Sequence, residues 1–286
     1  PMCFICDQES GFETDLSKIL QINQGSSLEV SEGINSNSAN RSLTSSDLIG
    51  EVTNEIKTEF AGLETIYYYI HDSYGDTFEH HGFASTEVSE PHESYEEKFI
   101  ENVFQSIDGY IELDFERTYS KSQGNIDIYD IGPYEVGPLA GAMLAGDLSD
   151  SSVDVFWENQ YDYSYVNGNY GSLTDLDAYV LIHEIGHAIG LSHPQNNGVD
   201  DPNGWWHDTD DTVMSYNSTY NEYITLSQTP PWRPADIAAL QSIWGVESGN
   251  TSASEKVIGE KYQLNNIKDY DGNLHGFLGD APAIVK

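Results

Sequence analysis

The chain has 286 residues, enough for one sizeable domain with appendages or for two modest ones, and its hydrophobic content of 38% is adequate for a core. Its 48 acidic residues against 11 basic ones give a formal net charge of -37, which repels nucleic acids and anionic membranes. We therefore expect no nucleic-acid partner, and we expect the acidity either to keep the protein soluble in saline or calcium-rich surroundings or to attract a cationic partner.

The sequence shows no sign of a membrane span or of a cleavable signal peptide. It contains no run of about 18 apolar residues, and its N-terminus lacks a basic segment followed by an apolar core. Pro1 before Met2 is interpreted as a non-native residue, which makes Met2 the natural start. The only two cysteines, Cys3 and Cys6, are expected to form a local disulfide, to act as a redox pair or to reach a metal elsewhere as thiolates.

The first elements follow a polar N-terminal extension. Residues 1–46, rich in Ser, Asn, Gln and Gly, are expected to be loosely ordered or to lie on a domain that begins near residue 47. Aromatic and β-branched residues predict the first strand at residues 63–70. The polar stretch that comes next carries four histidines: His71, His80, His81 and His92. Because their spacing matches no known ligand pattern, we interpret them as unpaired surface residues in preference to a second metal site.

The following segments carry helical and strand periodicity. Apolar residues recur at helical intervals over residues 94–107, which predicts an amphipathic helix. Alternating residues predict three strands, at residues 111–116, 126–129 and 153–157. Residues 132–146, rich in glycine and alanine, are expected to form a loop or a short edge element. With the helix described next, this order predicts an α/β (α+β) domain with a mixed sheet.

A histidine motif dominates the second half of the chain. His183 and His187 are four residues apart, so on a helix they lie on one face and can bind one ion. Glu184 is offset by about 100° around the helix, which places a carboxylate beside the metal as a general base. Gly190 can adopt the left-handed conformation that ends a helix, so that His193 turns back as a third ligand. Three imidazoles leave one position open for water, as in a catalytic zinc site.

The helix that carries this motif is expected to begin with a capping box formed by Thr174 and Asp177. Its buried stripe is expected to comprise Ala178, Leu181, Ile182, Ile185, Ala188 and Ile189. Residues 194–211 are dense in Asn, Asp and Gly. They are interpreted either as a plain surface loop or as a cleft wall or calcium-binding segment.

A second motif, Thr-Val-Met-Ser-Tyr, follows the third histidine and contains Met214 and Tyr216. Together with the histidine motif, it resembles the metzincin metalloproteases, whose Met-turn forms the floor under the zinc. Within that clan, the sequences Gly-Leu-Ser-His-Pro and Ser-Tyr look most similar to those of the serralysins, which are secreted bacterial zinc proteases. Matrix metalloproteases lack this tyrosine, and astacins have Glu in place of Pro after the third histidine.

The resemblance covers residues from near 60 to 246, with residues 236–245 similar to the helix that closes the serralysin protease domain. It implies a metzincin-like zincin fold with a mixed twisted sheet, a long active-site helix and a Met-turn, in a protease domain of residues 47–248. The implied activity is that of a zinc endopeptidase, a monomer that hydrolyses proteins or peptides.

The resemblance also assigns a role to each motif residue. One catalytic Zn²⁺ is bound by His183, His187 and His193. Glu184 is the general base of peptide hydrolysis. Met214 is the Met-turn residue, and Tyr216 either ligates zinc or stabilises the oxyanion.

Both ends of the chain depart from the serralysin pattern. Residues 249–286 are expected to be a linker or the start of a calcium-binding β-roll with structural Ca²⁺, although no Gly-Gly-x-Gly-x-Asp repeat is present. The resemblance implies secretion without a cleavable N-terminal signal peptide, through a C-terminal export signal. Residues 1–7 have the Pro-x-Cys and Cys-x-x-x-Asp spacing of the matrix metalloprotease cysteine switch. This implies a proenzyme in which residues 1–46 are an inhibitory propeptide and the thiolate of Cys3 occupies the open zinc position.

Two other functional classes compete with the protease interpretation. A catalytically silent secreted binding or surface-layer protein on a metzincin fold predicts a damaged ligand set, whereas every ligand is present. An intracellular zinc-binding or redox protein built around Cys-x-x-Cys has no support from the acidic charge or from partner motifs.

Overall fold

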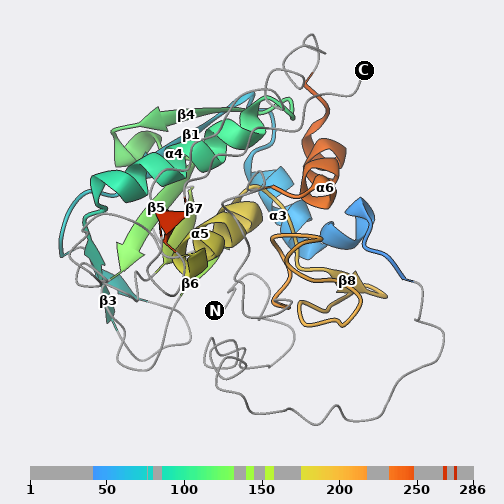
Figure 1. Ribbon diagram of the computed structural model, residues 1–286. Helices are drawn as coiled ribbons and strands as arrows, with labels where there is room; N and C mark the ends of the chain where they lie inside the picture. The colour runs from blue at the N-terminus through green and yellow to red at the C-terminus, as the bar shows by residue number, and fades with distance from the viewer. Residues whose placement is uncertain are drawn as a thin grey trace.

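A mixed β-sheet with helices packed against it makes up most of the described chain (Figure 1). The computed structural model describes residues 41–75, 77–79, 86–131, 140–144, 152–157, 175–217, 232–247, 267–268 and 274–275. The predicted class, a fold of mixed α and β content with a mixed sheet, is confirmed. No helix within these ranges is both long and apolar enough to cross a membrane.

The described helices comprise two short 3-10 helices and four α-helices. These are η1 (Ser45–Leu48), α3 (Glu51–Glu59), α4 (Ser94–Asp108), η2 (Lys121–Gln123), α5 (Asp175–Ala188) and α6 (Pro234–Trp244). The helices predicted at residues 94–107 and 236–245 are confirmed as α4 and α6, the latter beginning earlier because proline is favourable in a first helical turn. The sequence interpretation did not include α3, whose buried face consists of Val52, Thr53 and Ile56.

The strands pair into one large sheet and two small two-stranded ones. They are β1 (Thr65–Ile70), β2 (Thr77–Glu79), β3 (Thr86–Glu90), β4 (Asp114–Thr118), β5 (Ile126–Ile131), β6 (Ala140–Leu144), β7 (Val153–Trp157), β8 (Gln195–Asn196), β9 (Val199–Asp200), β10 (Ile267–Lys268) and β11 (Leu274–His275). In the large sheet β4, β1, β5 and β7 lie side by side and run parallel. β6 pairs antiparallel with β7, and β3 pairs antiparallel with β2 and with the end of β5.

The strand predictions hold with one shift. β1, β5 and β7 confirm the strands expected at residues 63–70, 126–129 and 153–157. The strand expected at residues 111–116 begins only at Asp114, because Ile111 instead forms an isolated bridge with Val246. Within residues 132–146 the described part is β6, a short edge element as predicted.

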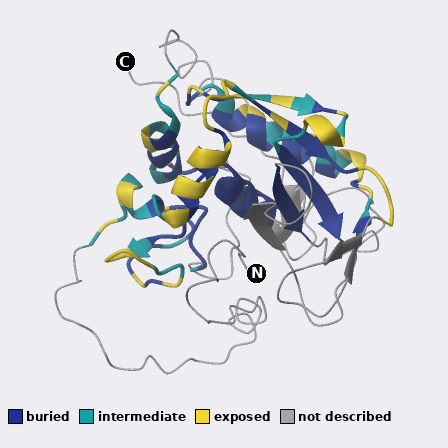
Figure 2. Ribbon diagram, turned by 180° about the vertical axis from the view of Figure 1, so that it is seen from behind, coloured by how far each residue is buried: buried dark blue, intermediate teal, exposed yellow. Residues whose placement is uncertain are grey.

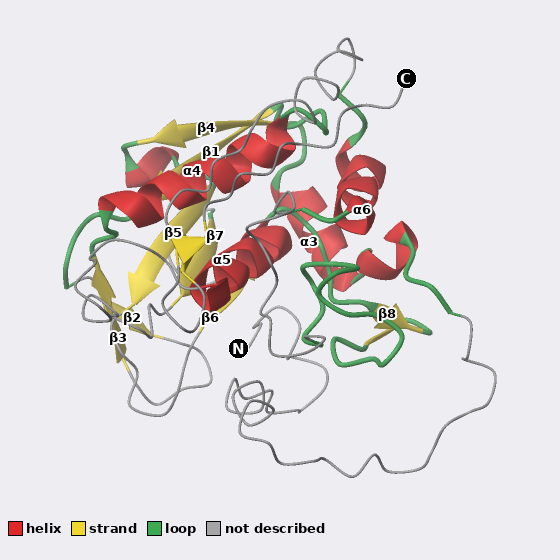
Figure 3. Ribbon diagram, in the orientation of Figure 1, coloured by secondary structure: helices red, strands yellow, loops and turns green. Residues whose placement is uncertain are grey.

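The core lies between the sheet and the pair α4 and α5, which cover one of its faces, and it also includes buried residues of η1, α3 and α6 (Figures 2 and 3). β5 is buried at every residue, as expected for a central strand of a parallel sheet. The stripe predicted on the histidine helix is fully buried, and every other residue from 178 to 194 is buried as well. From residue 178 on, α5 is therefore enclosed on all sides.

The interpretation of His71 and His92 as surface residues is wrong, since their exposed fractions are 2% and 7%. Nδ1 of His92 donates a hydrogen bond to the carbonyl oxygen of His71 at 2.8 Å, and Nε1 of Trp157 donates to Nε2 of His92 at 3.0 Å. Strands distant in sequence bring these partners together, so polar composition around the histidines did not reveal their burial. His80 and His81 lie outside the described residues.

The burial of His92 makes the stability of the fold depend on pH. Burial lowers the pKa of His92 from 6.5 to about 4. The unfolded chain therefore binds a proton before the folded one as the pH falls, and stability that is present above pH 6.5 is lost progressively down to about pH 4. This lowering of the pKa corresponds to ~3 kcal/mol of stability.

Between pH 7 and pH 4, we expect the free energy of unfolding to fall by up to ~3 kcal/mol more in the wild type than in His92→Gln. Glutamine can still accept the hydrogen bond of Trp157 but does not titrate. Urea denaturation at a series of pH values measures the difference. An identical pH dependence in both proteins would contradict the assignment.

Candidate functional site

The chain turns back at the end of α5 through a Schellman motif. The N–H of Gly190 donates to the carbonyl oxygen of His187 at 2.9 Å, and the N–H of Leu191 donates to that of Gly186 at 2.8 Å. Gly190 has a φ of 104°, which favours glycine. The predicted helix end at Gly190 is confirmed, and it brings His193 alongside the helix.

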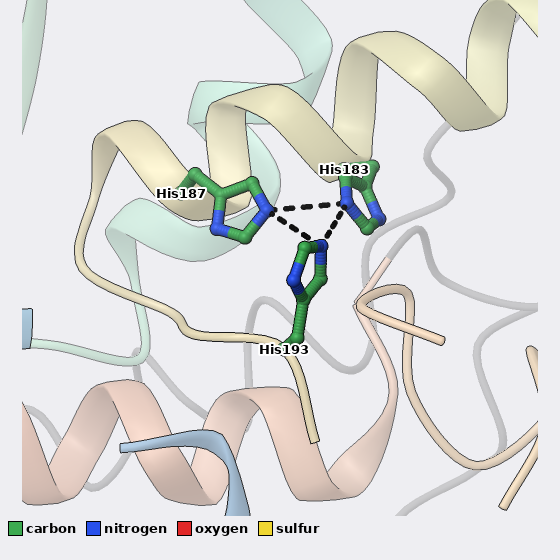
Figure 4. Close-up of side chains that lie close together, drawn as sticks. All are labelled: His183, His187 and His193. Carbon is green, nitrogen blue, oxygen red and sulfur yellow. Dashed lines mark hydrogen bonds between the residues drawn. The ribbon is translucent and has the colours of Figure 1, made fainter. Parts of the chain in front are cut away.

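Three imidazole rings converge where this turn meets the helix (Figure 4). Nε2 of His183 lies 3.2 Å from Nε2 of His187 and 3.3 Å from Nε2 of His193, and the latter two atoms are 3.2 Å apart. The exposed fractions of the three residues are 1%, 0% and 3%. Across the described ranges, they are the group of His, Cys, Asp or Glu side chains placed to hold one metal ion.

The opposite ring nitrogens face hydrogen-bond acceptors. Nδ1 of His183 donates to the carbonyl oxygen of Val213 and Nδ1 of His187 donates to that of Leu191, each at 2.8 Å. Because a carbonyl oxygen only accepts, these Nδ1 atoms carry the protons and the Nε2 atoms present lone pairs. Nδ1 of His193 lies 3.5 Å from a carboxylate oxygen of Asp200, which favours the same tautomer. The three Nε2 atoms that Figure 4 shows close together are therefore all acceptors, whose lone pairs repel one another. A cation bound between them would remove this repulsion.

The spacing of the three nitrogens fits a tetrahedral metal ion. Nitrogen ligands about 2.0–2.1 Å from zinc lie about 3.3–3.4 Å from one another at tetrahedral angles. The observed separations of 3.2 and 3.3 Å are close to this value. Burial, followed by the neighbouring His187 and His193, lowers the pKa of His183 well below its ordinary value, so this ring is neutral as metal binding requires. The cluster can bind a metal ion and leave a fourth position for another ligand.

Glu184 and Tyr216 are buried beside the cluster. Glu184 directly follows His183 on α5. The ring of Tyr216 lies 5.3 Å from that of His183 and 4.9 Å from that of His193, measured between centroids. A phenol ring thus lies against two of the three imidazoles, and a buried carboxylate follows the first of them in the sequence.

Met214 is fully buried and lies against α5 at Gly186. A Cβ atom at position 186 would come within 2.8 Å of the Met214 sulfur, so the close approach requires glycine. The sequence interpretation left position 186 as an unassigned residue between two ligands. The structure gives it a role, because it lets the methionine lie directly under the ligand-bearing turn.

Gly186→Ala is expected to destabilise the fold by about 1–3 kcal/mol, because the added methyl group overpacks the contact with Met214. Alanine is intrinsically the better helix former, so a net loss reports the clash. Urea denaturation measures the effect. The double variant Gly186→Ala/Met214→Ala should lose less than the sum of the two single variants. Strict additivity would contradict the contact.

A buried carboxylate on α6 holds the segment that precedes the methionine. Asp236 accepts hydrogen bonds from Oγ1 of Thr212 at 2.5 Å, from the N–H of Val213 at 3.2 Å and from the N–H of Arg233 at 2.8 Å. Burial raises the pKa of Asp236 to about 6, and these hydrogen bonds oppose the shift. Since the carbonyl of Val213 accepts the proton of His183, α6 helps to orient that ring.

Tyr179 is a further neighbour of the ligands that the motif did not reveal. Its hydroxyl donates to the carbonyl oxygen of Ser215 and lies 3.3 Å from Nδ1 of His183. Burial, and then the charge of Glu184, raises the pKa of Tyr179, so the hydroxyl keeps its proton. The spacing of four residues between Tyr179 and His183 on one helix is the sequence signal for this contact.

The loop expected at residues 194–211 begins with a hairpin. β8 and β9 pair antiparallel around Asn197 and Gly198, whose φ values of 58° and 80° are those of a type I′ turn. The Asn-Gly pair is the signal that the sequence interpretation overlooked. The hairpin places Asp200 behind His193.

The rest of this loop is only partly a surface loop. Trp205 is 63% exposed, whereas Trp206 and His207 are buried. Nδ1 of His207 lies 2.8 Å from Oγ of Ser215, so the loop packs against the residues that follow Met214.

Further sequence predictions fall on parts of the chain that are not described, among them the extension over residues 1–40. Cys3 and Cys6 lie outside the described residues, so the latch stays a prediction. The same holds for Thr174 of the expected capping box. Of residues 249–286, the structure describes β10 and β11, which pair antiparallel.

A scan against models of known protein families found no match to this chain.

Proposed function

We propose that this protein is a zinc-dependent endopeptidase with a metzincin-type catalytic domain. The observation that carries the proposal is the convergence of three Nε2 lone pairs, within 3.3 Å of one another, on a helix that also carries Glu184. His183, His187 and His193 would hold one Zn²⁺. Three neutral imidazoles with a fourth open position are a common donor set of catalytic zinc.

The residues around the cluster suit hydrolysis of an amide. When bound, zinc lowers the pKa of water and polarises a carbonyl group. Glu184 accepts the proton of the attacking water and passes it to the leaving amine. Tyr216 donates a hydrogen bond to the substrate carbonyl oxygen as negative charge develops there. The burial of both side chains strengthens these interactions, because the local dielectric constant is low.

The edge strand β6 supports a peptide as the substrate. β6 pairs with β7, and in the described part of the chain no strand pairs with its other edge. An extended peptide can add to such an edge through main-chain hydrogen bonds. β6 also contacts α5, so a peptide bound along it would pass near the ligand-bearing helix.

The arrangement of elements supports the metzincin type. α4 and α5 lie on one face of a mainly parallel sheet with an antiparallel edge strand, and Met214 lies beneath the ligand-bearing turn. The remaining expectations accompany this proposal. They are a monomer secreted without a cleavable N-terminal signal, an inhibitory propeptide over residues 1–46 with Cys3 as its latch, and Ca²⁺ binding towards the C-terminus.

Metal analysis combined with a peptidase assay tests the proposal. Purified protein is expected to contain about one zinc per chain. Protein trimmed of its first 40 residues is expected to cleave casein, to lose activity to a chelator and to regain it with zinc. Stoichiometric zinc without casein cleavage would favour the catalytically silent binding protein. Zinc bound only through Cys3 and Cys6 would favour the intracellular zinc or redox protein.

A further inference from the structure

The three histidines of the cluster differ in what holds them. His183 and His187 project from α5, and backbone carbonyls accept the protons of their rings. His193 lies in residues 191–194, which have no regular secondary structure. The position of its ring therefore depends on what packs against this short segment.

Residues 41–53, here called the strap, run antiparallel alongside the segment that carries His193. Oγ1 of Thr53 donates to the carbonyl oxygen of Gly190 at 2.7 Å, and the N–H of Ser192 donates to that of Leu48 at 2.9 Å. A Cβ atom at Gly50 would come within 2.7 Å of Oγ of Ser192, so the two stretches are in close contact. Figure 1 shows η1, which lies within the strap, beside the hairpin labelled β8, and the two are in contact.

Arg41, at the start of the strap, binds the β8–β9 hairpin. Its Nη2 donates to the carbonyl oxygen of Gln195 at 2.8 Å, and its Nη1 donates to Oδ1 of Asn196 at 3.1 Å. The guanidinium carbon lies 4.0 Å from the centroid of the Trp206 ring, and Nη2 also donates to Oδ1 of Asp47 at 2.5 Å. The planar fork of arginine can make these contacts together, whereas the single ammonium of lysine cannot.

The same hairpin carries the carboxylate that faces His193. Oδ2 of Asp200 lies 3.5 Å from Nδ1 of His193. Oδ1 of Asp200 accepts a hydrogen bond from the side chain of Gln195, the residue whose carbonyl Arg41 binds. A carboxylate behind a metal-binding histidine orients the ring and raises its basicity.

We infer that Arg41 is a positioning residue for His193 and that the metal affinity of the cluster depends on it. The coupling runs from the guanidinium through β8 and Asp200 to the ring of His193. The inference rests on the metal centre of the proposed function and is tested by metal binding, independently of peptide hydrolysis. It also means that the metal centre depends on Arg41, which precedes the domain start predicted near residue 47.

The dissociation constant of Zn²⁺, measured on the full chain by competition with a chromophoric chelator, tests this inference. Arg41→Ala is expected to weaken zinc binding by about 10- to 100-fold, the effect of losing an outer partner of a ligand. Arg41→Lys is expected to be intermediate, since it keeps the charge but loses the fork. The visible spectrum of Co²⁺ bound in place of zinc should change in Arg41→Ala, because it reports the ligand geometry.

Arg117 provides a matched control. It also pairs with carboxylates, those of Glu97 and Glu101, and its guanidinium lies 4.8 Å from the ring of Tyr119. These partners lie on α4 and directly after β4, away from the hairpin. Arg117→Ala is expected to bind zinc within about twofold of the wild type, as independent sites do. An equal loss in both arginine variants, or unchanged affinity in Arg41→Ala, would overturn the inference.

A second variant tests the route through the hairpin. Asp200→Asn, which is nearly isosteric, is expected to weaken zinc binding about 10-fold. Combined with Arg41→Ala, it should weaken binding by less than the product of the two single effects, because both act on one ring. If the double variant weakened zinc binding by the full product of the two single effects, the coupling through the hairpin would be wrong. Tight zinc binding without peptide hydrolysis would contradict the proposed function and leave this comparison intact.

Discussion

Glu184→Gln is expected to leave zinc binding unchanged and to reduce peptide hydrolysis by about two to four orders of magnitude, the usual contribution of a general acid–base group. Glutamine has the same shape, and Glu184 is not one of the three converging ligands. What the substitution removes is the ability to take a proton from water and return it to the amine. Zinc content and the rate of casein cleavage are measured on the same preparation.

A buried glutamate elsewhere supplies the control for this prediction. Glu96 is as buried as Glu184 and lies on α4, where its side chain accepts a hydrogen bond from the N–H of Glu93. Glu96→Gln should retain both zinc and activity. Casein cleavage that survives Glu184→Gln would remove this residue from the mechanism and with it the proposed reaction.

His187→Ala is expected to lose both zinc and activity, because one of the three converging nitrogens is removed. The loss of affinity should exceed the ~100-fold effect of an outer-shell change. Zinc stabilises the wild type by RT ln(1 + [Zn]/Kd), which is about 4 kcal/mol when zinc exceeds Kd by 1,000-fold. The rise in the melting temperature on adding zinc should therefore be large in the wild type and absent in the variant.

Another buried histidine distinguishes ligand loss from general damage. His92 bonds to the backbone of His71 and to Trp157 and takes no part in the cluster. His92→Gln should keep the zinc-dependent rise in melting temperature even though it lacks a buried imidazole. A zinc-dependent rise that persists in His187→Ala would place the metal elsewhere.

The convergence of the three histidines was predictable because its geometry is local. The spacing of His183 and His187 fixes them on one face of a helix, and the conformational freedom of Gly190 allows the turn that returns His193. These relations lie within a few residues of one another, where sequence periodicity is informative. The large strands were likewise visible from their own composition.

The partners behind the ligands were not predictable, because the fold brings them from far along the chain. Val213 bonds to His183, Asp236 bonds to Val213, and Arg41 bonds to the hairpin behind His193, and no local pattern assigns them to these places. The surface interpretation of His71 failed for the same reason, since its burial depends on pairing between distant strands. The Asn197-Gly198 turn was an exception, because its signal was local and was overlooked.

The enclosure of α5 bears on the stage of protein synthesis at which a metal ion can bind. Although the three ligands lie within residues 183–193, the contacts that hold them come from the strap, which is synthesised early, and from Asp236 on α6, which is synthesised late. The side chains of α5 that are buried from residue 178 on stay exposed until α6 has left the ribosome. The metal ion is therefore expected to enter a nearly complete domain and not a growing chain.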